Sequence, residues 1–227
     1  MKSSSTIIII PCYNEADTIE EVVSRAKQYA DVCVIDDCST DSSPEILAAI
    51  DGIHIIRHAK NTHIARGILD GMAYAVEKGY THAITMDAGL SHNPDEIPRF
   101  LECDGADVVL GRRVTKINTP LKRRILSAIG CFVYNVFLDF PRLVFKPYYG
   151  DLTTGFRKYS KAAMDVLLAT PIKSRSFDFI FESIMHVHKA GLSIAEVPIS
   201  YNFSNSSLNS RVIVDCIKMV LKSAVGK

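Results

Sequence analysis

Residues 6–15 read TIIIIPCYNE, and residues 31–41 read DVCVIDDCSTD. Each stretch is an apolar, mostly β-branched run that ends in a polar cluster, which is typical of a buried strand followed by a loop. Between them, residues 17–29 carry apolar side chains at helical spacing, and Asp17 is the expected N-cap. A strand, a helix and a second strand in this order predict one βαβ unit of a parallel sheet.

The same alternation continues through the first half of the chain. Further strands are predicted over 53–57, 82–86 and 107–110, and further helices over 44–50 and 65–78. Polar clusters follow four of the predicted strands: Pro11–Glu15, Asp36–Asp37, Asp87 and Arg112–Arg113. Ligands of open sheets of this kind bind beyond the carboxyl ends of the strands. We therefore expect an α/β fold, with a mostly parallel mixed sheet flanked by helices and a binding site where these four segments meet.

The second half of the chain has a less regular pattern. Helices are predicted over 122–138, 162–168, 177–189 and 212–222, with strands at the end of 151–159 and over 194–200. A loop rich in Ser and Asn covers 201–210. A length of 227 residues without an evident linker suits a single domain, which we divide into halves 1–113 and 114–227.

Composition excludes several classes of protein. The formal net charge of +1 gives no overall field that would attract nucleic acid. The six cysteines form no C-x-x-C pair and are interpreted as reduced core residues of a cytosolic protein. The first six residues are too short and polar for a signal peptide, and no run of about 18 apolar residues would span a bilayer. We expect a cytoplasmic chain that can still lie against a membrane.

Several motifs resemble those of the family 2 glycosyltransferases, which have the GT-A fold. The opening motifs are Ile9–Glu15 and Ile35–Asp41, and the segments Asp87–Pro98, Leu121–Arg124, Asp151–Arg157 and Glu196–Ser200 are similar to the branch that transfers mannose or glucose to dolichyl or polyprenyl phosphate. The resemblance implies that residues 1–113 bind a UDP- or GDP-linked sugar and that 114–227 receive the acceptor. It covers nearly the whole chain.

The resemblance also assigns roles to individual residues. Pro11, Tyr13, Glu15, Ile35 and Asp37 would hold the nucleoside, while Asp87 and Ala88 would lie beside the ribose and the diphosphate. Arg113 and Arg123 would face phosphate groups, for which the planar guanidinium is well suited. Ordinary alternatives stay open: an Asx-type turn for residues 36–41, surface charge for 112–113 and a solvated helix face for 122–124.

The sequence departs from the family at its metal motif. The family motif is Asp-x-Asp, whereas here Gly89 follows Asp87 and Ala88. One carboxylate can still hold Mg²⁺ or Mn²⁺ together with phosphate oxygens. We therefore expect Asp87 to be the metal ligand, with weakened metal dependence and retained activity. Two further departures are the cation-poor loop at 202–208 and the pair His63 and Gly67, where many relatives have Gly and Ala.

The acceptor remains open at this level. The resemblance implies displacement at the anomeric carbon with inversion. A lipid phosphate is already anionic and requires no base, whereas a glycan hydroxyl requires a carboxylate, for which Asp151, Asp178 and Glu182 are candidates. Basic and aromatic residues over 122–149 suit an interfacial segment on anionic lipid or, equally, a core-packing helix. A catalytically weak nucleotide-sugar binder is the third hypothesis, because of Gly89.

Overall fold

The computed structural model describes residues 3–138 and 148–203. The predicted helix over 212–222, most of the loop at 201–210 and residues 139–147 of the expected interfacial segment lie outside this range. The statements below concern the described part of the chain.

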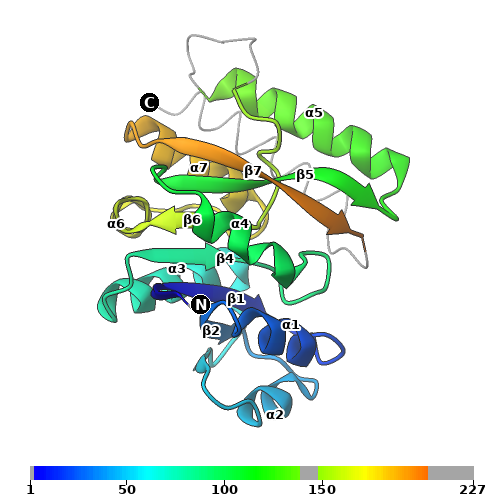
Figure 1. Cartoon of the computed structure of the whole chain (residues 1–227), viewed down its shortest axis with the longest axis vertical. Coiled ribbons are helices and arrows are strands. Elements are labelled where there is room, and N and C mark those ends of the chain that lie inside the picture. The colour runs from blue at the N-terminus through cyan, green and yellow to red at the C-terminus, as the bar shows by residue number, and fades with distance from the viewer. Residues whose placement is uncertain (1–2, 139–147, 204–227) are drawn as a thin grey trace.

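Seven strands of the described chain form one mixed sheet in the order β3-β2-β1-β4-β6-β5-β7 (Figure 1). The strands are β1 (Ser3–Cys12), β2 (Ala30–Asp36), β3 (His54–Arg57), β4 (His82–Thr85), β5 (Val108–Ile117), β6 (Arg157–Ser160) and β7 (Ile194–Asn202). The neighbours from β3 to β4 are parallel, and β5 is parallel to β7. Only β6 runs antiparallel, to β4 and to β5. The expected mostly parallel α/β sheet is confirmed.

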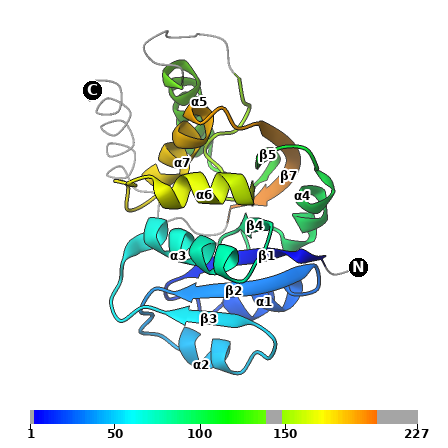
Figure 2. The ribbon, with the colours of Figure 1, turned by 90° about the vertical axis from the view of Figure 1, so that its left-hand side faces the viewer.

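Helices cover both faces of this sheet. They are α1 (Ile19–Ala26), α2 (Ser43–Ala48), α3 (His63–Glu77), α4 (Ile97–Glu102), α5 (Leu121–Phe137), α6 (Lys161–Ala169) and α7 (Asp178–Lys189), with a 3-10 turn η1 (Pro94–Glu96) before α4. Figure 2 shows α3 and α6 side by side across one face.

The apolar side chains of strand β1 contribute to the hydrophobic core on both faces of the sheet. Ile7 and Ile9 pack into the core beneath α3, α6 and α7, whereas Ile8 and Ile10 pack into the core beneath α1, α2 and α4. Successive side chains of a strand point to opposite faces, so a continuous apolar run is what a strand covered on both faces requires. All four side chains are essentially fully buried.

Two predicted details differ from the structure. The strand predicted over 107–110 runs on to Ile117, because it pairs with β7 along nearly its whole length. Helix α1 has Thr18 at its N-cap position rather than Asp17, and the Thr18 hydroxyl donates to the carbonyl oxygen of Ala88 at 3.0 Å. This hydrogen bond ties the start of α1 to the segment that follows β4.

The five cysteines of the described chain are free thiols, as expected. Cys12, Cys33 and Cys131 are buried, while Cys38 and Cys103 are half-buried. The sixth, Cys216, lies outside the described residues.

Candidate active site

A cleft of about 640 Å³ opens at the carboxyl ends of β1, β2 and β4 and beside β5. Every residue that the sequence assigned to nucleotide, metal or phosphate lines it, so the predicted convergence of separate segments is present. These nine residues are Pro11, Tyr13, Glu15, Ile35, Asp37, Asp87, Ala88, Arg113 and Arg123.

One end of the cleft is an apolar slot. Pro11 at the end of β1 and Ile35 at the end of β2 form its wall together with Gly67 of α3. A Cβ atom at Gly67 would lie 3.6 Å from Cγ2 of Ile35 and 3.8 Å from Cβ of Pro11, so the three residues are in close contact. Tyr13 lines the same cleft with about half of its surface exposed. An apolar slot with an exposed aromatic ring suits a flat heterocycle.

Asp37 is the carboxylate of this slot, and the loop before α3 holds it in place. Its Oδ1 accepts hydrogen bonds from the backbone N–H of Thr62 at 2.8 Å and the Thr62 hydroxyl at 2.9 Å, and it lies 2.8 Å from Nδ1 of His58. Its Oδ2 accepts from the backbone N–H of His63 at 2.8 Å. Burial raises the pKa of Asp37, but these hydrogen bonds outweigh it and leave the pKa below its ordinary value.

The neighbouring carboxylates of the 36–41 segment have structural roles. Asp36 Oδ1 accepts from the backbone N–H of Ser39 at 2.9 Å, and Asp41 Oδ1 accepts from that of Ser43 at 3.0 Å. Asp41 Oδ2 also accepts from the backbone N–H of Ala16 at 3.1 Å, which joins this loop to the one after β1. The Asx-type turn therefore applies to Asp36 and Asp41, while Asp37 faces the cleft.

Asp87 follows β4 and reaches the middle of the cleft with 40% of its side chain exposed. Its backbone N–H donates to Nδ1 of His92 at 3.2 Å, so that ring nitrogen acts as an acceptor. Burial lowers the pKa of His92, which keeps the imidazole neutral. Burial raises the pKa of Glu15, which lines the same cleft, and the charge of Asp87 adds to the rise. Two neighbouring carboxylates thus line the middle of the cleft.

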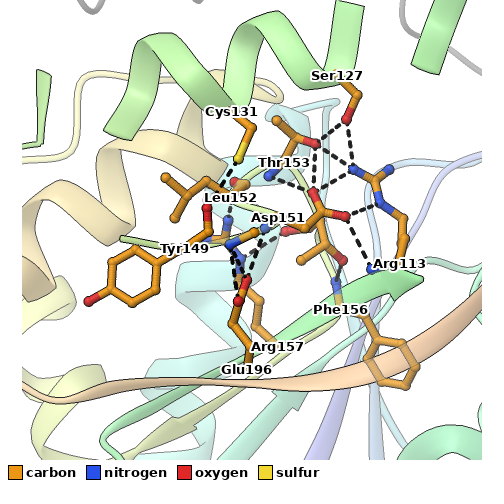
Figure 3. Close-up of polar contacts among 12 residues, drawn as sticks. Arg113, Ser127, Cys131, Tyr149, Asp151, Leu152, Thr153, Phe156, Arg157 and Glu196 are labelled. Atoms are coloured by element: carbon orange, nitrogen blue, oxygen red, sulfur yellow. Dashed lines mark hydrogen bonds and ion pairs between the residues drawn. The ribbon is translucent and has the colours of Figure 1, made fainter. Parts of the chain in front are cut away.

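Arg113 on β5 is held by a bidentate ion pair with Asp151 (Figure 3). Its Nε lies 2.6 Å from Asp151 Oδ2, and its Nη2 lies 2.8 Å from Oδ1. Nη2 also donates to the hydroxyls of Ser127 and Thr153. Within residues 3–138 and 148–203, Nη1 has no hydrogen-bond partner, and Figure 3 shows it pointing away from the network. Its two N–H groups remain available to an anion in the cleft.

The loop that carries Asp151 is fastened from both sides. The backbone N–H groups of Gly150 and Asp151 donate to the carboxylate of Glu196 at 2.9–3.0 Å. From β6, the fully buried Arg157 donates to the carbonyl oxygens of Leu152 at 2.9 Å, Thr154 at 2.8 Å and Ile180 at 2.6 Å (Figure 3). The position of Asp151, and through it that of Arg113, is therefore set by the main chain around it.

Arg123 enters the cleft from the first turn of α5. It is half-buried and lies over the Phe203 ring at 5.1 Å, whereas its neighbours Lys122 and Arg124 are exposed. A solvated helix face thus describes Lys122 and Arg124, while Arg123 lines the cleft.

A model of glycosyl transferase family 2 matches residues 7–168, which is most of the chain. The chain belongs to glycosyl transferase family 2. An undecaprenyl-phosphate mannosyltransferase of Micrococcus luteus is 29% identical over 207 residues, which cover 86% of this chain and 82% of that protein. A UDP-N-acetylglucosamine–dolichyl-phosphate N-acetylglucosaminyltransferase of Methanococcus voltae is 26% identical over 223 residues, which cover 88% and 87%.

Solved structures confirm the GT-A fold of this glycosyltransferase. Glucosyl-3-phosphoglycerate synthase from Mycobacterium tuberculosis superposes with a TM-score of 0.75 at 14% identity, over 99% of this chain and 81% of that one. In the described part of the glycosyltransferase, no helix has the length and apolar character needed to cross a bilayer.

The three carboxylates considered as bases for a glycan acceptor do not line the cleft. Asp151 is paired with Arg113, and Asp178 accepts from the backbone N–H of Ser176 at 2.8 Å. Glu182 is buried and accepts from the backbone N–H groups of Lys173 and Ser174 at 2.8–3.2 Å. Burial raises the pKa of Glu182, but the contact with His186 and these hydrogen bonds bring it down to about 2. Asp178 is half-buried and Glu182 is buried, so the alternative of a solvent-exposed helix face, which their spacing of four left open, does not apply to them.

Other lining residues were not assigned a role from the sequence. Thr153, Ser176, Phe177, Ile180 and Tyr201 all reach the cleft. The Tyr201 ring lies 5.2 Å from the Arg113 guanidinium, because β7 pairs with β5 as far as Asn202. Such residues depend on contacts between distant segments, which no local pattern reveals.

Proposed function

We propose that this family 2 glycosyltransferase moves a sugar, with inversion, from a nucleotide diphosphate to the phosphate of a polyprenyl lipid. The donor occupies the part of the cleft lined by residues of the first half. The nucleoside lies in the slot of Pro11, Ile35 and Asp37 beside Tyr13. The diphosphate extends past Glu15 toward Asp87.

A divalent cation fits the centre of this cleft. Glu15 and Asp87 would both repel a bare diphosphate, and a cation between them removes that repulsion. Asp87 would hold Mg²⁺ or Mn²⁺, and phosphate oxygens and water would complete the coordination. Among the described residues, no group of three His, Cys, Asp or Glu side chains is placed to bind a metal. When bound, the cation stabilises charge on the departing diphosphate. The glucosyl-3-phosphoglycerate synthase structure contains Mn²⁺ and UDP.

The observation that carries the acceptor assignment is the distribution of charge in the cleft. Among the described residues, the carboxylates that line it all come from the first 87 residues: Glu15, Asp17, Asp37 and Asp87. The opposite side presents Arg113 and Arg123 and no carboxylate. Such a wall attracts an anion and offers no base to deprotonate a hydroxyl.

A phosphate monoester is suited to that wall. It is ionised at neutral pH, so one of its oxygens attacks the anomeric carbon without giving up a proton. The new carbon–oxygen bond forms as the bond to the nucleotide diphosphate breaks, and the departing group carries the electron pair. Arg113 binds the acceptor phosphate through Nη1 while Asp151 fixes the guanidinium. The names of the bacterial and archaeal relatives, which act on undecaprenyl and dolichyl phosphate, support the same class of acceptor.

The surface of α5 supports contact with the membrane that carries such a lipid. Leu121, Ile125, Ile129 and Phe132 lie on one side of the helix and are each 51–70% exposed. Residues 108–138 contain six Lys or Arg and no Asp or Glu. An apolar stripe within a cationic segment suits an anionic lipid surface, and Arg123 extends from the same helix into the cleft.

The decisive experiment offers two acceptors to the purified protein. Undecaprenyl or dolichyl phosphate and a lipid-linked sugar with free hydroxyls are each incubated with a panel of labelled UDP- and GDP-sugars. We expect transfer to the lipid phosphate alone. Transfer only to the sugar hydroxyl would establish the glycan alternative, and binding of a nucleotide without any transfer would establish the catalytically weak binder.

A further inference from the structure

Two residues of α3 that line the cleft are unfavourable choices for their own backbone positions. They are His63, the first residue of the helix, and Gly67, one turn further on. Residues four apart lie on the same side of a helix, so both belong to one surface beside the slot of Pro11 and Ile35. The role inferred for them rests on the proposed function, since it concerns the nucleotide that the cleft binds.

His63 carries a side chain in a backbone conformation that glycine adopts more easily. Its φ is 69°, in the left-handed region. The turn itself is required, because the backbone N–H of His63 donates to Asp37 Oδ2 at 2.8 Å, but glycine would make the same turn with less strain. The imidazole is exposed and makes no hydrogen bond, ion pair or ring contact with another residue in 3–138 or 148–203. No such contact therefore offsets the unfavourable φ.

Gly67 is the opposite case, a glycine where the helix would accept a side chain. It lies in the interior of α3, and its φ is outside the left-handed region. A Cβ atom there would lie 3.6 Å from Cγ2 of Ile35 and 3.8 Å from Cβ of Pro11, which are ordinary van der Waals distances. Alanine would therefore fit, would form the helix more readily and would bury a further methyl group. Glycine instead leaves a methyl-sized space in the wall of the slot.

Both choices disfavour the fold locally, and both change the same part of the cleft. Local conflicts of this kind are expected where a ligand requires them. A flat base can approach the backbone of α3 more closely at Gly67 than at a residue with a Cβ atom. The exposed imidazole of His63, one turn away, can then pack against the same nucleoside.

We infer that His63 and Gly67 form the α3 side of the nucleoside subsite, in which Gly67 provides the depth of the slot and His63 covers the bound nucleoside. Both residues contact the base and ribose of the donor. Neither contacts the diphosphate, which extends toward Asp87 in the proposed binding mode. The bound nucleoside supplies the contacts that the imidazole lacks in the free protein.

Replacing each residue by the one that its backbone favours separates stability from binding. Gly67→Ala should raise the melting temperature by about 1–4 °C, and His63→Gly should leave it unchanged or raise it. Calorimetric titration of the full chain with UDP and GDP in the presence of Mg²⁺ should show binding change in the opposite direction. For whichever nucleotide the native chain binds more tightly, we expect the affinity to fall about tenfold in Gly67→Ala and about threefold in His63→Gly.

Matched controls make the same two changes away from the cleft. Gly130→Ala lies inside α5, where a Cβ atom would meet only Cγ2 of Thr153 among the described residues, at 3.8 Å. Asn118→Gly lies at a φ of 52° in the loop before α5. Neither control position lines the cleft. We expect both controls to bind the nucleotide as the native chain does, and an equal loss of affinity in them would refute a specific role for α3.

Nucleoside monophosphates locate the contact. UMP or GMP, measured by competition, should lose as much affinity in the two variants as the corresponding diphosphate does. A loss confined to the diphosphate would overturn the inference, as would unchanged affinity in either variant or a lower melting temperature of Gly67→Ala. Each of these results leaves the proposed transferase intact. Failure of the native chain to bind either diphosphate would overturn both.

Discussion

Replacing Asp151 by Asn should weaken both the fold and the reaction, because this carboxylate is the partner of Arg113. The two side chains are 6% and 13% exposed, and Asp151 also accepts from the backbone and hydroxyl of Thr153. Removing one partner of a buried pair costs about 3–5 kcal/mol. We take the lower figure, about 3 kcal/mol, since Arg113 borders the cleft and can regain water. For a chain of this size the melting temperature falls by about 6–12 °C.

The pH dependence of that loss follows from the same pair. Burial raises the pKa of Asp151, but Arg113 and Thr153 outweigh it and leave the pKa below its ordinary value. A carboxylate of this kind contributes stability above its unfolded pKa of about 3.9, and the contribution disappears as the pH falls through the folded value. Urea unfolding should therefore show a constant gap between native chain and Asp151→Asn from pH 5 to 8. The gap should narrow below about pH 4.

Kinetics distinguish this role from that of a general base. With Arg113 no longer fixed, we expect kcat/KM for the lipid phosphate to fall about 100-fold. Asp107→Asn is the matched control: Asp107 is a carboxylate whose pKa the Ser193 hydrogen bonds lower, and it lies just before β5 and outside the cleft. The Asp107→Asn control should have a somewhat lower melting temperature and an unchanged kcat/KM for the lipid phosphate. A variant of Asp151 that loses turnover at an unchanged melting temperature would refute this reasoning and restore the base.

Three further changes test the remaining parts of the site. Asp87→Asn should abolish turnover, and EDTA should slow the native enzyme; full activity of the variant would show that the metal assignment is wrong. Gly89→Asp has room, because a Cβ atom there meets only Glu15 Oε2, at 4.0 Å. In the presence of UDP, Mn²⁺ should raise the melting temperature of the Gly89→Asp variant more than that of the native chain. An equal rise would show that an Asp at position 89 adds no metal ligand. Ile129→Asp on α5 should reduce sedimentation with anionic vesicles several-fold and leave UDP binding unchanged. The control is Leu192→Asp, at a half-buried position away from α5, which we expect to leave vesicle binding intact.

Local patterns predicted the strands of the first half and the edge of the sheet at which their polar ends meet. The run at Ile7–Ile10 specifies a strand buried on both faces, and the polar residues after each parallel strand meet because such strands end at one edge. Nine assigned residues lie in one cleft as a result. The roles of these residues toward nucleotide, metal and acceptor remain proposals, and Gly89 removes a metal ligand from the family pattern.

Contacts between distant segments could not be predicted from the sequence. Asp151 was one of three candidate bases for a glycan acceptor. Its partner Arg113 is 38 positions away, and nothing near Asp151 in sequence indicates the pair. Glu182 was named as a candidate base for a glycan acceptor, although it is buried and accepts from the backbone of Lys173 and Ser174. Buried carboxylates are identified by what they accept from, and those donors are placed by tertiary structure.

Arg157 holds the backbone of the 151–155 loop in place through the loop's carbonyl oxygens. Within the loop its donors reach only the carbonyl oxygens of Leu152 and Thr154, while outside the loop they reach the Ile180 carbonyl and the Ser183 hydroxyl. Loop residues other than Asp151 and Thr153, which hold Arg113, can therefore change without loss of the loop's path. A deletion of one residue has the opposite effect, because it moves every carbonyl out of register with a fixed guanidinium. Evolution of this loop is expected to proceed by substitution at constant length.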